Sequence, residues 1–245
     1  MKRALSLLLF VNLFFGCFAI AQQASVSQVA ADFRTVNETY LQTPRLSMKV
    51  SYTLFPSYTS TVAFETDKGV YYKDGINSYS ELLGIVSLTN SNLSMTLDSN
   101  EQTIVVTDAP SKAARNPSLV DLDSLLKVCS SLDSKDAGGG IRYYKLRFDG
   151  RAFFEYNAID IYVNSTTHFL ERIILYYRAE MDLDESDSNP TKDRPRLEIR
   201  YSDISTSPVF SVEQFSEKKY IHAAGKKITC ATAYNGYRLI NHKLH

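Results

Sequence analysis

The sequence contains no tryptophan, few glycines and prolines, and no long apolar run beyond its first residues. Of its 245 residues, 10 are Gly and 7 are Pro, whereas 16 are Tyr and 13 are Phe. This composition argues against a disordered chain and favours strands, in which aromatic side chains are common. No segment after residue 21 is apolar over the ~20 residues that a membrane-spanning helix needs. The absences therefore predict a folded, strand-rich chain.

An excess of charge of either sign is also missing. The chain has 27 Lys and Arg residues and 27 Asp and Glu residues, and residues 1–21 contain two of the basic ones. Without that segment, 25 basic residues stand against 27 acidic ones, a net charge of −2. Nucleic-acid binding depends on many Lys and Arg contacts to phosphates. The sequence therefore predicts no nucleic-acid partner.

Motifs for catalysis or metal binding are scarce. None of the four histidines has a second metal ligand at short spacing, and no serine lies in a G-x-S-x-G motif. The run Gly138–Gly140 is expected to follow a helix and precede a strand, the reverse of the order in nucleotide-binding loops. An acidic stretch between Asp182 and Asp193 lacks the glycine and glutamate of a calcium loop. We therefore expect no metal, no cofactor and no enzymatic activity.

The first 21 residues have the pattern of an export signal. Lys2 and Arg3 precede an apolar stretch from Ala4 to Phe15, and Ala19-Ile20-Ala21 forms a small-x-small cleavage site. The pattern predicts cleavage after Ala21 and an exported protein. Gly16-Cys17 allows an alternative in which Cys17 is acylated and the protein becomes a lipoprotein.

The mature chain begins with a helical period and then changes to a strand period. From residue 25 to residue 42, apolar residues recur every three or four positions, which predicts an amphipathic helix that ends before Pro44. In the following segment, 45–55, Leu46, Met48, Val50 and Tyr52 alternate with polar residues. This alternation predicts a strand with one apolar and one polar face.

Further strands and a second helix follow. The alternation and the turn-like breaks predict strands at 61–66, 69–73, 77–82, 93–97, 103–107, 141–148, 153–163, 169–178 and 196–203. A second apolar stripe with helical spacing predicts a helix over 117–132. The tetrapeptide 234–237 is expected to form a turn. We therefore predict an α+β fold, mainly β, in which helices cover the concave face of a strongly curved antiparallel sheet.

Two cysteines lie beyond the signal segment, Cys129 and Cys230. In an oxidising compartment they could form a disulfide that closes a loop of about 100 residues, worth ~4 kcal/mol in the chain-entropy model. They could equally be two separate buried thiols. The spacing leaves both possibilities open.

The order of elements resembles that of the periplasmic outer-membrane lipoprotein carriers, the LolA/LolB-like family. The resemblance lies in Tyr40-Leu41-x-x-Pro44-x-Leu46-x-Met48-x-Val50, in 169–177, and in Leu197–Ile204 followed by Phe210 and Phe215. It implies an eleven-stranded half-barrel over residues 22–224, with residues 225–245 as a C-terminal extension. The strand arginine with which the family locks its lid has no matching position here, which places that gating mechanism in doubt.

The resemblance implies a carrier that binds acyl chains of lipoproteins or lipids and shuttles them towards the outer membrane, with membrane-bound donor and acceptor proteins as partners. Such a carrier needs no catalytic residue. Exposing one sixteen-carbon chain to water costs about 10 kcal/mol, at ~0.8 kcal/mol per methylene. The apolar concavity is expected to be lined by Leu46, Met48, Val50, Tyr52, Leu93, Met95 and Leu97. The lid is expected to comprise Leu119, Leu122, Leu125, Leu126 and Cys129.

A second hypothesis belongs to another functional class. The same fold could serve as an envelope sensor or interaction module that acts through a protein partner. The long polar tail 225–245 would suit docking to that partner.

Overall fold

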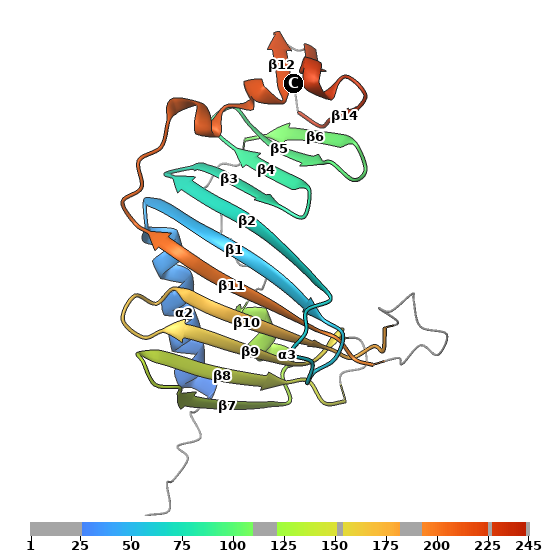
Figure 1. Cartoon of the computed structure of the whole chain (residues 1–245). Coiled ribbons are helices and arrows are strands. Elements are labelled where there is room, and N and C mark those ends of the chain that lie inside the picture. The colour runs from blue at the N-terminus through green and yellow to red at the C-terminus, as the bar shows by residue number, and fades with distance from the viewer. Residues whose placement is uncertain (1–25, 110–121, 151–153, 182–192, 225–226, 244–245) are drawn as a thin grey trace, which may run out of the picture.

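The computed structural model describes residues 26–109, 122–150, 154–181, 193–224 and 227–243. Within these ranges, twelve strands form one strongly curved sheet that does not close into a barrel (Figure 1). The strand order is β14-β6-β5-β4-β3-β2-β1-β11-β10-β9-β8-β7. All neighbouring strands are antiparallel except β14 and β6, which run parallel. The predicted fold class is therefore confirmed.

Short strands and a few helices make up the described chain. In chain order they are α2 (Val26–Gln42), β1 (Arg45–Phe55), β2 (Glu65–Asp74), β3 (Asn77–Leu82), β4 (Ile85–Thr89), β5 (Leu93–Asp98), β6 (Thr103–Asp108), α3 (Leu122–Val128), β7 (Ser131–Asp136), β8 (Ile141–Arg147), β9 (Tyr156–Asn164), β10 (Leu170–Tyr177), β11 (Arg196–Ser205), the short 3-10 helices η1 (Val212–Phe215) and η2 (Glu217–Lys219), β12 (Ile221–Ala224), β13 (Lys227–Cys230), the 3-10 helix η3 (Thr232–Tyr234) and β14 (Arg238–Asn241). Strands β12 and β13 form a separate hairpin.

Helix α2 forms where the helical period predicts it, and its apolar stripe is buried. Val29, Phe33, Val36 and Tyr40 are each at most 2% exposed. The C-terminal end of the helix is held by Lys73 of β2, which is itself only 2% exposed. Its Nζ donates to the carbonyl oxygens of Tyr40 at 2.7 Å and Leu41 at 3.1 Å. A cation at this end of a helix also interacts favourably with the helix dipole.

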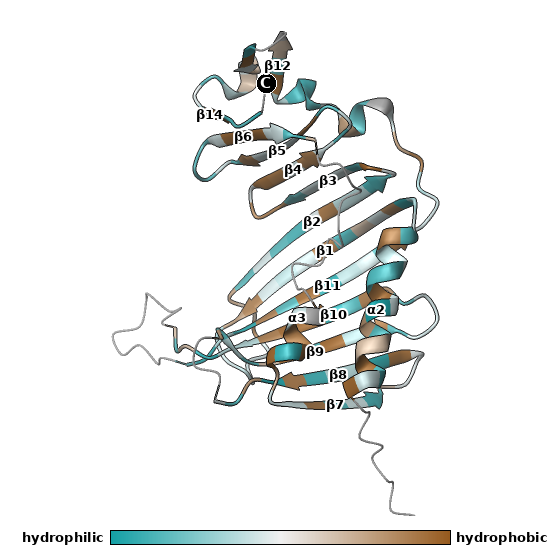
Figure 2. Ribbon diagram, turned by 180° about the vertical axis from the view of Figure 1, so that it is seen from behind, coloured by the Kyte–Doolittle hydropathy of each residue, from teal (hydrophilic) through white to brown (hydrophobic). Residues whose placement is uncertain are grey.

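The two faces of the sheet carry two separate apolar cores. We call the face covered by α2 and α3 the helix face and the opposite one the outer face. The helix-side core joins both helices to β1, β2 and β7–β11, and it includes Leu46, Met48, Tyr71 and Ile199. Figure 2 shows α2 crossing one end of these strands and α3 lying over β9 and β10.

The outer core covers the other half of the sheet from the opposite side. It joins β3–β6 to the segment after β11 and includes Leu88, Leu97, Ile104 and Phe215. Buried Asn90 ties the sheet to that segment, because its amide donates to the Phe215 carbonyl at 3.1 Å and to the Glu217 carboxylate at 2.7 Å. The C-terminal segment thus forms one wall of this core.

The pairing register shows why the cores lie on opposite faces. Met48 pairs with Tyr71 and Tyr71 with Ser80, so these three share the helix face. The neighbouring Tyr72 pairs with Tyr79, Tyr79 with Leu88, and Leu88 with Met95, which places these four on the outer face. Strand β2 therefore contributes to both cores through two consecutive tyrosines.

Several predicted boundaries are wrong. Residues 61–64 of the expected strand 61–66 are not in a strand, and Glu65 and Thr66 belong to β2 together with the expected strand 69–73. The expected turn between them is absent because Asp67 and Lys68 pair with β1. The residues 85–89 form an unpredicted strand, β4. Helix α3 ends at Val128, and Leu132 lies in β7, a short strand with a single apolar residue and hence no alternation to detect. The Gly138–Gly140 run therefore connects two strands of a hairpin.

Three expectations fall on residues outside the described ranges. These are the signal segment 1–21 with Cys17, the lid residue Leu119, and most of the acidic stretch from Asp182 onwards. The predicted turn at 234–237 is present. The expected boundary at residues 224 and 225 falls between the paired strands β12 and β13, and β14 belongs to the main sheet.

Cys129 and Cys230 are both free thiols. Cys129 packs against the helix-side core, whereas Cys230 packs against the outer core. The two thiols therefore lie in cores on opposite faces of one sheet. Of the two possibilities, that of two separate thiols is the one observed.

Replacing Lys73 with Met is expected to destabilise the fold by about 1–3 kcal/mol, because the carbonyls of buried Tyr40 and of Leu41 at the end of α2 lose their donor. Chemical denaturation of the variant measures this change. Lys68→Met is the matched control, since Lys68 is an exposed lysine on the same strand and surface substitutions usually cost less than about 0.5 kcal/mol. Equal stability of the two variants would contradict the capping role of Lys73.

Candidate functional site

The seven residues expected to line one concavity lie on two faces. Leu46, Met48, Val50 and Tyr52 of β1 point to the helix face, where all four contribute to or pack against the helix-side core. Leu93, Met95 and Leu97 of β5 lie in the outer core instead. The expectation of a single shared lining is therefore corrected, because the register between β1 and β5 places the apolar residues of β5 on the opposite face.

The helix face of β3–β6 is largely polar where an apolar lining was expected. Most of its residues carry hydroxyl groups, including Ser78, Ser80, Ser87, Thr89, Ser94, Thr96 and Thr107, and its apolar residues are Leu82, Ile85 and Val105. Figure 2 shows no described helix over this part of the sheet. The continuous apolar surface of the helix face therefore lies in the half made by β1, β2 and β7–β11.

Four of the five expected lid residues belong to the described chain, and they lie over this apolar half. Leu122 and Leu125 of α3 are buried in the helix-side core. Leu126 and Cys129 pack against the same core and are partly exposed. Helix α3 has only seven residues, so it is too short to be stable on its own and depends on these contacts.

A small cavity opens on the helix face where the apolar half meets the polar half. Its volume is about 120 Å³, room for roughly four waters at ~30 Å³ each. The residues that line it come from β1, β2, β3 and β11, namely Val50, Tyr52, Gly69, Val70, Tyr71, Ser80, Glu81, Leu82 and Tyr201. The cavity thus contains two of the predicted ligand-binding residues, Val50 and Tyr52.

Gly69 keeps β2 and β3 close at this cavity. Gly69 of β2 pairs with Val50 of β1. A Cβ atom at this position would lie 2.8 Å from Cδ1 of Leu82 and would collide with the carbonyl oxygen of Glu81. The absence of a side chain therefore lets Leu82 approach the strand and form one wall of the cavity.

Tyrosines supply much of the cavity wall. Burial raises the pKa of Tyr52 and that of Tyr71 to about 12 each. Tyr201 is 5% exposed, and burial raises its pKa well above the ordinary value. These phenols are neutral over the physiological range, so they can act as hydrogen-bond donors within an apolar surface. Periodicity predicted Tyr52, but it gave no signal that Tyr71 and Tyr201 would join it.

A larger groove lies on the outer face of the same strands. It has a volume of about 630 Å³, and its lining includes Lys49, Lys68, Glu81 and Asp203. Lys49 and Asp203 form an ion pair at 2.7 Å, in which both side chains are more than 60% exposed. Charges of both signs and high exposure make this groove a poor site for an apolar ligand.

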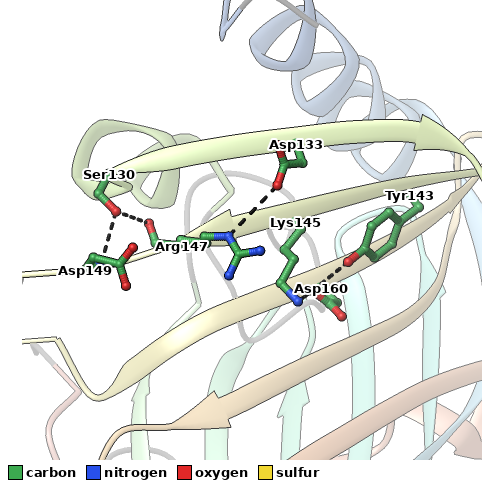
Figure 3. Close-up of polar contacts among 7 residues, drawn as sticks. All are labelled: Ser130, Asp133, Tyr143, Lys145, Arg147, Asp149 and Asp160. Atoms are coloured by element: carbon green, nitrogen blue, oxygen red, sulfur yellow. Dashed lines mark hydrogen bonds and ion pairs between the residues drawn. The ribbon is translucent and has the colours of Figure 1, made fainter. Parts of the chain in front are cut away.

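The outer face of β8–β11 carries a layer of polar and aromatic residues. Tyr143, Lys145 and Arg147 of β8 point outwards, whereas Tyr144, Leu146 and Phe148 are buried in the helix-side core. Arg142 lies on the helix face, where it forms an ion pair with Asp32 of α2 at 3.8 Å. Tyr143 donates to the Asp160 carboxylate at 3.0 Å, and Lys145 lies 3.7 Å from it (Figure 3). The outward residues are thus engaged with their neighbours, which supports the simple alternation of a polar and an apolar side.

Asp160 is the centre of this polar layer. It is only 4% exposed and also accepts a hydrogen bond from Tyr176 at 3.0 Å. Arg147 pairs with Asp133 at 3.9 Å (Figure 3). A buried carboxylate with several donors is a structural arrangement, because its lone pairs are already occupied. This polar layer therefore has a structural role in the fold.

Neither metal-binding clusters nor membrane-spanning helices occur in the described ranges. Those residues include no group of three or more His, Cys, Asp or Glu side chains that could hold a metal ion. The helices in them are also too short or too polar to cross a membrane.

Comparison with known proteins gives only distant similarities. No protein-family model matches the chain, and no curated protein sequence matches it. Among solved structures, an uncharacterized conserved protein from Thermus thermophilus has 8% sequence identity and a TM-score of 0.41, and the match covers 85% of this chain and 98% of that chain.

Two further similar structures have names that refer to lipoproteins or to the LolA superfamily. A LolA superfamily protein from Nitrosomonas europaea has 9% identity and a TM-score of 0.29, with 75% of this chain and 97% of that chain covered. The Mycobacterium tuberculosis lipoprotein LppX has 9% identity and a TM-score of 0.36, with 75% and 98% covered. All these TM-scores lie below 0.5, so we transfer neither residues nor ligands from them.

The buried tyrosines predict a loss of stability at alkaline pH. In the unfolded chain they ionise near their ordinary pKa of about 10, whereas Tyr52 and Tyr71 have a pKa of about 12 when folded. Between these values the unfolded chain releases protons first, so stability present below pH ~10 is lost as the pH rises. Tyrosinate absorbance of the buried residues should therefore appear together with unfolding measured by circular dichroism. Smooth ionisation of all tyrosines near pH ~10 without unfolding would contradict this.

Proposed function

We propose that the chain is an exported carrier that holds an acyl chain of a lipoprotein or lipid on the helix face of its sheet and shuttles it towards the outer membrane. The acyl chain would lie against Val50 and Tyr52, on the face of the sheet that α2 and α3 cover. Leu46 and Met48 would form the floor deeper in the core. In this proposal the protein needs neither a cofactor nor a catalytic residue, and its partners would be membrane-bound donor and acceptor proteins.

One observation supports this proposal above the others. The helix-side core is continuous with a cavity and with partly exposed apolar residues that pack against it, including Leu82, Leu126 and Leu197. A ligand entering the cavity would therefore meet apolar surface along its path. Cavities of this kind, largely apolar with a few polar groups, are typical of ligand-binding sites.

The cavity of about 120 Å³ is smaller than the ~300–1,000 Å³ of ordinary ligand pockets, so loading would require the apolar site to enlarge. In this proposal α3, which packs on the same core, is the element that moves. Its two buried leucines, Leu122 and Leu125, hold it with about 3–6 kcal/mol, at ~1.5–3 kcal/mol for each side chain. Transfer of one sixteen-carbon chain from water gains about 10 kcal/mol. The gain exceeds the cost, so an acyl chain could displace α3 and occupy its contacts.

The competing sensor or interaction module receives less support from the tail. Within the described residues, the segment 227–241 packs against the outer core and supplies β14 to the main sheet. A tail used in this way offers less surface for docking than a free extension would.

A charge in the cavity should abolish loading. Val50→Asp places a carboxylate on the apolar helix face, where burying it without a partner is costly. Ser51→Asp is the matched control, because Ser51 points to the outer face and is paired with Lys68 and Arg200. We expect native mass spectrometry of protein purified from its own envelope fraction to find a lipid adduct on the wild type and on Ser51→Asp, but none on Val50→Asp.

Circular dichroism of both variants verifies that they are folded. A folded Val50→Asp variant with a full lipid adduct would show that the helix face does not bind the ligand. A bare polypeptide mass for the wild type would favour the interaction module.

A further inference from the structure

The hydroxyl of Tyr71 is a buried donor that no described residue satisfies. Tyr71 is 6% exposed, and its oxygen has no hydrogen-bond partner within the described part of the chain. Leaving such a group unpaired is destabilising. A phenylalanine would fill the same space without that cost. The hydroxyl therefore requires an explanation beyond packing.

Tyr71 lines the cavity on the helix face. Its hydroxyl oxygen lies within the cavity wall, so a ligand reaches it only when the cavity opens on loading. Ser80 of β3 is paired with Tyr71 in the register and lines the same cavity. The lining also contains apolar groups from Val50 and Leu82 and the phenols of Tyr52 and Tyr201. Among its described side chains, Tyr71 is the one with a buried and unpaired hydroxyl.

The position of the cavity indicates where a polar part of a ligand would lie. On one side, the helix-side core continues under α2 and α3. On the other side, the helix face becomes the hydroxylated surface of β3–β6. A ligand with its acyl chain towards the core would place the polar beginning of that chain at this border.

We propose that the Tyr71 hydroxyl donates a hydrogen bond to the carbonyl oxygen of an ester-linked acyl chain. This inference rests on the proposed carrier function and names the class of ligand. Tyr71 acts here as a specificity-determining residue that distinguishes an ester from a plain hydrocarbon chain. Ser80 is the second polar side chain available near the same carbonyl.

Alternative head chemistries fit the cavity less well. A free fatty acid would bring a carboxylate, and burying that charge without a cation costs far more than one hydrogen bond returns. Among the described residues, no lysine, arginine or histidine lines the cavity. An amide-linked chain would bring an N–H group that needs an acceptor of its own. The neutral ester carbonyl requires only a donor, and a neutral phenol supplies one.

The test compares two lipids that differ only in the carbonyl. The probes are dipalmitoyl phosphatidylcholine and its ether analogue dihexadecyl phosphatidylcholine, each titrated into delipidated full-length mature protein. We expect the wild type to bind the ester lipid about 5- to 12-fold more tightly, the ratio that one neutral hydrogen bond of about 1–1.5 kcal/mol provides. Tyr71→Phe should reduce this ratio to about one while leaving the affinity for the ether lipid unchanged.

Tyr72→Phe is the matched control, because Tyr72 is the next residue on β2 and points to the outer core. It should retain the ester preference. In the absence of lipid, Tyr71→Phe should melt at the same temperature as the wild type or higher, since an unpaired hydroxyl has been removed from the interior. A lower melting temperature would mean that the hydroxyl has a partner within the protein and would overturn the inference.

The remaining outcomes separate the inference from the proposed function. Equal binding of the two lipids by the wild type, or an ester preference that survives Tyr71→Phe, would overturn the role of Tyr71 and leave the carrier function standing. Failure of the wild type to bind either lipid would overturn both.

Discussion

Strand β2 imposes the constraint on which the rest of the molecule depends. In a strand, consecutive side chains point to opposite faces, and each face of β2 contributes a tyrosine to a core. Tyr71 enters the helix-side core and Tyr72 packs against the outer core. The covered face of the sheet therefore changes at β2, although the pairing of strands continues without a break. A sheet of this kind needs two separate coverings, and the chain supplies one mainly from its N-terminal helix and the other from its C-terminal segment.

This exchange of faces determines where a ligand could bind. The helices α2 and α3 cover only the half of the sheet that is apolar on the helix face. Beyond β2, the serines and threonines of β3–β6 limit the apolar surface of that face. The cavity beside Gly69 lies at that limit, where the helix-side core ends. Its lining combines apolar contacts from Val50 and Leu82 with the buried hydroxyl of Tyr71. An apolar chain with one polar end matches this distribution better than a wholly polar or wholly apolar ligand.

The sequence predicted the elements better than it predicted their relation. The 3.6-residue period of α2 and the strict alternation of β1 and β11 are strong local signals, and both kinds of element have the predicted bounds to within two residues. Alternation also identifies which side chains of β5 share a face. It cannot tell which face of β5 continues that of β1, because this depends on the register of every pairing between them. For that reason the expected placement of Leu93, Met95 and Leu97 is wrong. The Lys73 cap and the two cysteines in separate cores depend on contacts between distant residues, for which local pattern carries no signal.

The parallel pairing of β14 with β6 has a consequence for the order in which the molecule can be completed. Residues 238–241 pair with 103–106, and the 196–205 strand must reach β1, which lies far earlier in the chain. Pairings between such distant segments close large loops and form slowly. Until residues 238–241 pair, the edge of β6 and one wall of the outer core therefore remain uncovered. An uncovered strand edge can pair with another chain, so this interval is when the molecule is most open to association with its own copies.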